Sequence, residues 1–76
     1  MTSGSIAECV RVAREQAELS QRDLAALLGS DHSWLNRVEA GKQIPTVDTL
    51  ERIAKATGAT FRATWDPKKG LTFSID

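Results

Sequence analysis

The sequence has very little cysteine and histidine, since Cys9 and His32 are the only residues of their kinds among 76. A single cysteine cannot form an internal disulfide, so we expect the protein to reside in a reducing cytoplasm. One cysteine and one histidine are also too few ligands for a structural zinc site. We therefore expect no bound metal and no other cofactor.

Long apolar runs and a signal peptide are missing as well. No run approaches the ~20 apolar residues that span a bilayer, so we expect no membrane association. The opening residues 1–5 contain no lysine or arginine, whereas a secretory signal begins with a basic segment. We expect residues 1–4 to form a disordered lead-in.

An excess of charge of either sign is absent. Lysine and arginine together number 10, aspartate and glutamate together number 10, and the net charge is zero. Phosphate contacts by lysine and arginine supply most of the affinity of proteins for nucleic acid. A zero net charge therefore argues against nucleic-acid binding unless the basic side chains share one face of the molecule, which the sequence alone leaves open.

The residue set that a covalent enzyme needs is also lacking. A nucleophile, a base and an orienting group would have to come from Cys9, His32 and a few serines. Cys9 lies on the apolar stripe of the first predicted helix, whereas His32 belongs to another helix. We therefore expect no enzymatic activity.

A chain of 76 residues holds one domain and one core. Domains this short bury only about 60% of their unfolded surface, so oligomerisation often stabilises them. Apolar residues at spacings of three and four, in runs that each follow a capping side chain, predict four helices over residues 5–18, 20–28, 31–40 and 46–57. The expected N-caps are Ser5, Ser20, Asp31 and Thr46.

The pattern changes to a period of two after Gly58. Apolar and polar residues alternate in 61–66 and again in 71–76, and residues 66–70 between them are rich in turn formers. This pattern predicts a β-hairpin. A lone hairpin is barely stable in water, so it needs a surface to pack on.

Two of the predicted short helices, joined through Gly29, have the geometry of a helix-turn-helix. The second helix is then held so that its N-terminal residues can enter the DNA major groove. Ala25 must be small where the next helix crosses it, and Gly29 must accept a positive φ. The apolar residues that hold both helices against the first are Leu24, Leu28, Leu35 and Val38.

A longer series of motifs surrounds this unit: Leu19-Ser20-Gln21-Arg22-Asp23-Leu24-Ala25, then Gly29, Val38-Glu39-Ala40-Gly41-Lys42, Pro45-Thr46-Val47-Asp48-Thr49-Leu50, Ile53-Ala54-Lys55-Ala56 and Gly58. Together they resemble the Cro/phage-repressor (XRE) helix-turn-helix family over roughly residues 6–61. Ser30 and Ala40 depart from the family, which usually has an apolar residue and an asparagine there. The resemblance implies a mainly α fold: a four- to five-helix Cro/repressor-like domain over residues 5–59, followed over residues 60–76 by a short β-hairpin or by strands that pair between chains.

The resemblance also implies roles for individual residues. Gln21 matches a glutamine that binds a backbone phosphate and braces the base-reading residues, and Lys42 and Gln43 match a loop that grips phosphates. Arg14 and Glu39 match a largely buried ion pair. The positions that read base edges, with their neighbours, are His32, Ser33, Trp34, Asn36 and Arg37.

Side-chain chemistry agrees with base reading. Arg37 can bond O6 and N7 of guanine, Asn36 can pair with adenine, and Ser33 can serve either. Trp34 has two interpretations: it contacts a thymine methyl or a sugar, or it anchors a protein partner, as exposed tryptophans often do.

These observations predict a sequence-specific regulator of transcription that binds double-stranded DNA, acting as a dimeric repressor at a palindromic operator. Residues 60–76 are the expected dimerisation element, because on a monomer they would leave an apolar surface and a free strand edge exposed. The expected interface residues are Phe61, Ala63, Trp65, Leu71, Phe73 and Ile75.

An alternative function is that of an antitoxin, which binds a protein toxin and regulates its own operon. Some antitoxins resemble this chain in having such a helical domain followed by a β-strand that pairs across the dimer. The neutral net charge and the two tryptophans favour a protein partner. The two functions can coexist, because antitoxins of this kind usually repress their own genes.

Overall fold

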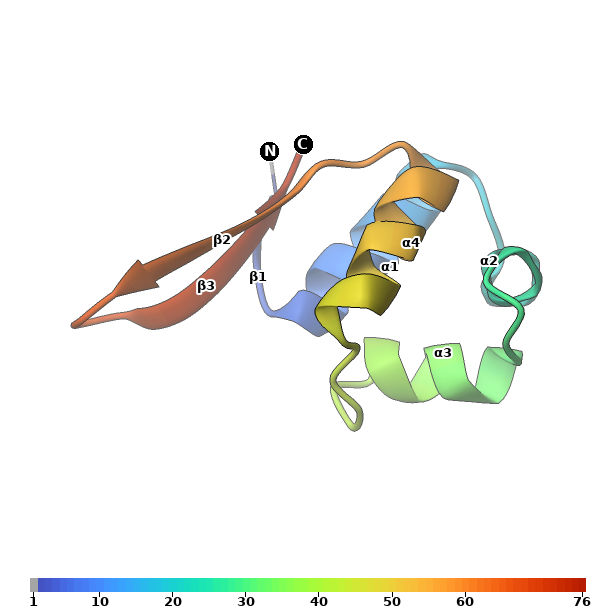
Figure 1. Ribbon diagram of the computed structural model, residues 1–76, viewed down its shortest axis with the longest axis horizontal. Helices are drawn as coiled ribbons and strands as arrows, with labels where there is room; N and C mark the ends of the chain where they lie inside the picture. Colours follow the sequence, from blue (N-terminus) through green and yellow to red (C-terminus); the bar gives the residue numbers. More distant parts are fainter. Residues whose placement is uncertain (1) are drawn as a thin grey trace.

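Four helices precede a β-hairpin in the computed structural model, which describes residues 2–76 (Figure 1). The predicted mainly α fold with a C-terminal hairpin is confirmed, and four helices occur in the described part of the chain. In chain order the elements are β1 (Thr2–Gly4), α1 (Ile6–Gln16), α2 (Gln21–Leu27), α3 (His32–Glu39), α4 (Val47–Thr57), β2 (Phe61–Asp66) and β3 (Gly70–Ile75).

Each helix begins after the capping residue that the sequence predicts. The backbone N–H of Glu8 donates to Ser5 Oγ at 3.2 Å, and that of Thr49 donates to Thr46 Oγ1 at 3.1 Å. At α2 the cap is reciprocal, because the Ser20 backbone N–H also donates to the carboxylate of Asp23. Such caps satisfy N–H groups that have no partner within the helix, and they fix where the short helices start.

The main core draws on all four helices. Its buried side chains are Val10, Leu24, Leu28, Leu35, Val38 and Ile53, each at most 5% exposed. Since α2 and α3 are too short to be stable alone, their positions depend on this shared packing. The core thereby holds both helices of the predicted helix-turn-helix in place.

The strands form one antiparallel sheet in the order β1-β3-β2. Thr2 lies opposite Ile75 on one side of β3, and Phe61 lies opposite Ile75 on the other. The expectation of a disordered lead-in is therefore wrong for residues 2–4, while Met1 lies outside the described residues. Without β1, one edge of β3 would have unpaired backbone N–H and C=O groups. β1 pairs with these groups through its own backbone, which requires no apolar side chains.

The hairpin is only partly packed on the helices. Ile75 is 1% exposed and joins Cys9 and Ala13 of α1 in a second core cluster, so its expected place in a dimer interface is wrong. Phe61 and Phe73 are half-buried against the core. The far half of the hairpin extends away from the helices (Figure 1), and the apolar side chains of Trp65 and Leu71 are exposed there.

Candidate nucleic-acid interface

The connection between α2 and α3 is closed by backbone hydrogen bonds. The N–H of Gly29 donates to the carbonyl of Ala26, and that of Ser30 donates to the carbonyl of Ala25 at 2.9 Å. Gly29 has a φ of 69°, the left-handed conformation that this helix ending requires. Ala25 is 1% exposed, in agreement with the predicted need for a small residue at this crossing.

The outer face of α3 gathers most of the predicted base-reading residues. Leu35 and Val38 are buried, and this orients the helix. Ser33, Asn36 and Arg37 are exposed and follow the i, i+3, i+4 spacing that places side chains on one helix face. His32 is exposed at the first position of the same helix.

Trp34 does not share this face. It is half-buried and packs against the main core. It also lines a small hollow with Leu28, Ser30, Thr49 and Arg52. Trp34 therefore has a packing role between α2, α3 and α4, and its contact with DNA or with a protein partner stays a prediction.

The loop after α3 is tied back to the helix. The backbone N–H of Lys42 donates to the carbonyl of Arg37 at 2.9 Å, with Gly41 at a φ of 76°. Arg37 Nε in turn donates to Gln43 Oε1 at 3.1 Å. The structure therefore brings Arg37, Lys42 and Gln43 together. The contact between Arg37 and Gln43 could not be predicted from the sequence pattern.

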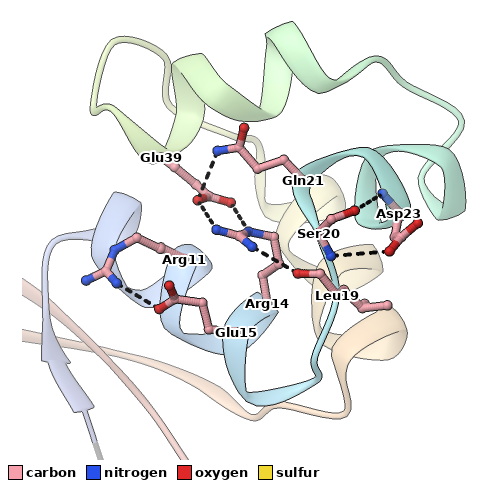
Figure 2. Close-up of polar contacts among 8 residues, drawn as sticks. All are labelled: Arg11, Arg14, Glu15, Leu19, Ser20, Gln21, Asp23 and Glu39. Atoms are coloured by element: carbon pink, nitrogen blue, oxygen red, sulfur yellow. Dashed lines mark hydrogen bonds and ion pairs between the residues drawn. The ribbon is translucent and has the colours of Figure 1, made fainter.

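A polar network beneath α2 and α3 links them to α1 (Figure 2). Arg14 Nε donates to Glu39 Oε2 at 2.8 Å and Nη2 donates to Oε1 at 3.0 Å, with the two side chains 14% and 5% exposed. Arg14 Nη1 also donates to the carbonyl of Leu19. The hydrogen bond with Glu39 raises the pKa of Arg14 despite the opposing effect of burial.

Gln21 extends this network toward the surface. Its Nε2 donates to Glu39 Oε1 at 3.2 Å, a contact that the sequence did not predict (Figure 2). A primary amide carries two N–H groups. One of them is used here, which leaves the other for a group outside the protein.

Two exposed basic side chains, Arg37 and Lys42, lie on α3 and the loop that follows it, whereas the exposed Asp31 caps the start of the helix and the chain as a whole is neutral. Glu39 is the only acidic residue between residues 32 and 45, and its charge is balanced by Arg14 at close range. Arg37 and Lys42 are exposed there and belong to no ion pair among the described residues. The zero net charge of the whole chain therefore does not prevent a local positive charge around Arg37 and Lys42.

No helix within residues 2–76 combines the length and apolar character needed to cross a bilayer. Neither do these residues contain a group of three or more potential metal ligands of the His, Cys, Asp and Glu types.

Comparison with known proteins places the geometry in context. Residues 5–64 match the family model described as a helix-turn-helix domain. An uncharacterised HTH-type transcriptional regulator of Mycobacterium tuberculosis is 43% identical over 47 residues, which cover 62% of this chain and 34% of that protein. Multiprotein-bridging factor 1 of Candida albicans is 29% identical over 58 residues, which cover 76% of this chain and 38% of that protein. The matched segments thus span between a third and two fifths of these relatives.

Proposed function

This chain belongs to the helix-turn-helix family of the XRE-like type and carries a DNA-binding regulatory domain, and from this premise we propose that it is a dimeric repressor that binds a palindromic operator. The observation that carries the proposal is the exposed face of α3, where Ser33, Asn36 and Arg37 lie together beside the basic loop. An α-helix presenting such a face fits the major groove of B-DNA.

Base reading is assigned to the outward side chains of α3. Arg37 uses Nε for Gln43, which leaves its two Nη groups for the O6 and N7 acceptors of a guanine. Asn36 is assigned to an adjacent adenine, and Ser33 and His32 to the bases nearest the helix start. Trp34 is left out of this set because its side chain packs inward.

Phosphate binding is assigned to the residues that flank this face. Phosphate oxygens accept hydrogen bonds, so their partners must be donors. Gln21 has one N–H to spare after its bond to Glu39. Gln43 accepts from Arg37 through its carbonyl oxygen, which leaves its amide N–H groups for phosphate, and Lys42 adds an exposed positive charge.

Dimerisation is assigned to the exposed part of residues 60–76. Trp65 is 71% exposed and Leu71 is 55% exposed, and Ala63 lies on the same face of the hairpin. Large contiguous apolar surfaces of this kind mark interaction sites. A two-fold pair would present two α3 helices to successive major grooves, and a protein seated there blocks polymerase.

The test is selection of bound sequences from a pool of random duplexes. We expect enrichment of an inverted repeat whose half-site centres lie about 34 Å apart, one helical turn. Enrichment of a single unrepeated site would contradict the dimeric arrangement. Absence of any enriched sequence would contradict base reading by α3.

A second function, that of an antitoxin, is favoured by one observation: the apolar side chains of Trp65 and Leu71 are exposed in the single chain, as expected of a surface that binds a protein. The expected sign is a toxin-like reading frame adjacent to this gene. Co-expression of the two products and co-purification would test it. If the neighbouring product does not co-purify, or no such reading frame exists, the antitoxin proposal is wrong while the repressor proposal stands.

A further inference from the structure

A groove of about 450 Å³ lies between α4 and the hairpin. Its lining is mainly apolar, with Val47, Leu50 and Ala54 from α4 and Phe61, Ala63 and Phe73 from the two strands, and it also includes the charged residues Glu51 and Arg62. Val47 is 82% exposed at its rim. The groove therefore presents apolar surface to water at the place where the hairpin leaves the helical domain.

An exposed apolar side chain of the size needed to fill such a groove, that of Trp65, lies on the same hairpin but outside the groove. Phe61, Ala63 and Trp65 share one face of β2, because side chains alternate along a strand. The groove is lined by the first two and not by Trp65. Trp65 therefore lies on the same face of β2 but beyond the groove of its own chain, and its side chain is exposed to solvent.

The outer edge of β2 is also open. In the sheet order β1-β3-β2, both edges of β3 are used, whereas β2 has a partner on one side only among residues 2–76. An unpaired edge of six residues is a template for another strand. Phe61, Arg62 and Ala63 of β2 line the groove, so a strand added to this edge would lie next to it.

We propose that the groove is filled by Trp65 of a second copy of this chain, whose β2 pairs antiparallel with β2 about a two-fold axis at Ala63. The proposal rests on the dimeric regulator proposed above and specifies how its two chains meet. Each chain contributes one tryptophan and receives one. Such reciprocity is what a two-fold interface requires.

The pattern of faces limits the possible registers. Residues directly opposite each other in an antiparallel pair point to the same side. The apolar faces of both copies coincide only when an odd-numbered residue lies opposite an odd-numbered one. With the axis at Ala63, Trp65 of one copy lies opposite Phe61 of the other, over the groove. With the axis at Thr64, Phe61 would instead face Pro67, which follows the strand and has no N–H to donate.

The size of the contact is adequate for a dimer. A buried aromatic side chain contributes about 150–250 Å², and Trp65 is 71% exposed in the single chain. Val47 at the rim of the groove and Leu71 opposite Trp65 on β3 add further exposed apolar surface. Together with the paired backbones, these groups account for a large part of the ~800 Å² that a stable interface buries on each partner.

The experiment measures the mass of the full chain without DNA, by light scattering or sedimentation, for two matched variants. Val47→Glu puts a charge at the rim of the groove, at the first position of α4, where an acidic residue suits the helix dipole. Leu27→Glu puts the same charge at another exposed apolar site, 61% exposed, at the end of α2 and away from the hairpin (Figure 1). We expect the parent and Leu27→Glu to be dimers. Val47→Glu should weaken dimerisation by at least about a hundredfold, because it buries an unpaired charge.

A second measurement reports on Trp65 itself. In a Trp34→Phe background Trp65 is the only tryptophan, and its emission should shift to the blue over the same concentration range in which the mass doubles. A dimer whose Trp65 emission stays that of an exposed indole would overturn the proposal. So would a dimer that survives Val47→Glu, or a chain that is monomeric at every concentration. A dimer that survives Val47→Glu would overturn this inference alone. A chain that is always monomeric but still selects a half-site sequence would overturn both this inference and the dimeric arrangement proposed above, whereas DNA reading by α3 would be retained.

Discussion

Arg37 and Trp34 are neighbours on α3 with opposite environments. Arg37 is exposed and bonded to Gln43, whereas Trp34 is half-buried against the core. Both were predicted as base-reading positions from their places in the motif. A place in the motif identifies the helix on which a residue lies, but it does not determine whether a large side chain packs against the core. Trp34 packs over the turn between α2 and α3, where the hollow beside Ser30 accommodates it.

Replacing Arg37 and Lys42 separately should distinguish base reading from phosphate binding. Arg37→Ala should cost about 1–3 kcal/mol of binding free energy on the selected operator and relax specificity at one base pair. Lys42→Ala should weaken binding to all duplexes alike and lower the slope of log K against log salt by about one. Titrations on matched and mismatched duplexes measure both. Equal losses on every duplex for Arg37→Ala would remove the base-reading assignment.

The contact between Arg14 and Glu39 should be essential for stability. Glu39→Ala leaves a mostly buried guanidinium without its partner and should cost about 3–5 kcal/mol, a large share of the 5–15 kcal/mol typical of a domain. Replacing both residues with apolar ones of similar size should be much milder. Thermal melts of the single and double variants measure the difference.

The ion pair of Arg11 and Glu15 supplies the matched control. It has the same 2.8 Å separation, but its side chains are 44% and 52% exposed (Figure 2). Glu15→Ala should therefore cost at most about 1 kcal/mol. If Glu15→Ala and Glu39→Ala lower the melting temperature equally, burial is not what makes the second pair important.

At the scale of elements, the helices could be predicted more completely than the strands. A helix is closed by bonds to residues three or four positions away, so caps such as Ser20 and Asp31 mark its start within the sequence itself. Strand β1 has no alternating apolar pattern and exists because β3 offers it an edge. Alternation in the hairpin likewise predicts which residues share its apolar face, but not what that face packs against. Ile75 is buried inside its own chain, whereas Trp65 on the same face is exposed.

The turn of the hairpin depends on the charge of one carboxylate. Asp66 Oδ1 accepts the backbone N–H groups of Lys69 at 3.0 Å and Lys68 at 2.7 Å, and these bonds lower the pKa of Asp66 below its ordinary value of 3.8. A group whose pKa is lowered by folding stabilises the folded form above its ordinary pKa, and this stabilisation is lost as the pH falls through the lowered value. The turn should therefore loosen in acid, below about pH 3.8.

NMR titration of the Asp66 carboxyl and of the Lys68 and Lys69 amides would measure this effect. The amide shifts should follow the carboxyl, with a midpoint below 3.8. Asp66→Asn keeps an acceptor oxygen and should remove the pH dependence while preserving the turn. A carboxyl midpoint at or above the ordinary value would contradict the role given to these hydrogen bonds.

At the scale of the whole molecule, the proposed dimer fixes the distance between two reading helices. Binding should therefore depend on the helical phase of the half-sites, since they must face the same side of the duplex. Inserting about 5 base pairs, half a helical turn, between them should reduce affinity to that of a single half-site. Gel-shift titrations with the original and lengthened operators measure this. Unchanged affinity would show that the two DNA-reading faces are not rigidly connected.

The pairing of β1 with β3 joins residues from the two ends of the described chain. A ribosome delivers about 5–20 residues per second, starting from the N-terminus, so all four helices are synthesised before Ile75 exists. The buried residues of the main core lie in the helices or, for Leu28, directly after α2, so this core needs no strand residue among them to form. The cluster around Cys9 must wait for Ile75, and the sheet must close a loop of nearly the whole chain. A nascent chain therefore acquires its DNA-reading face first and its surface for a second copy last, which delays assembly until the strands are complete.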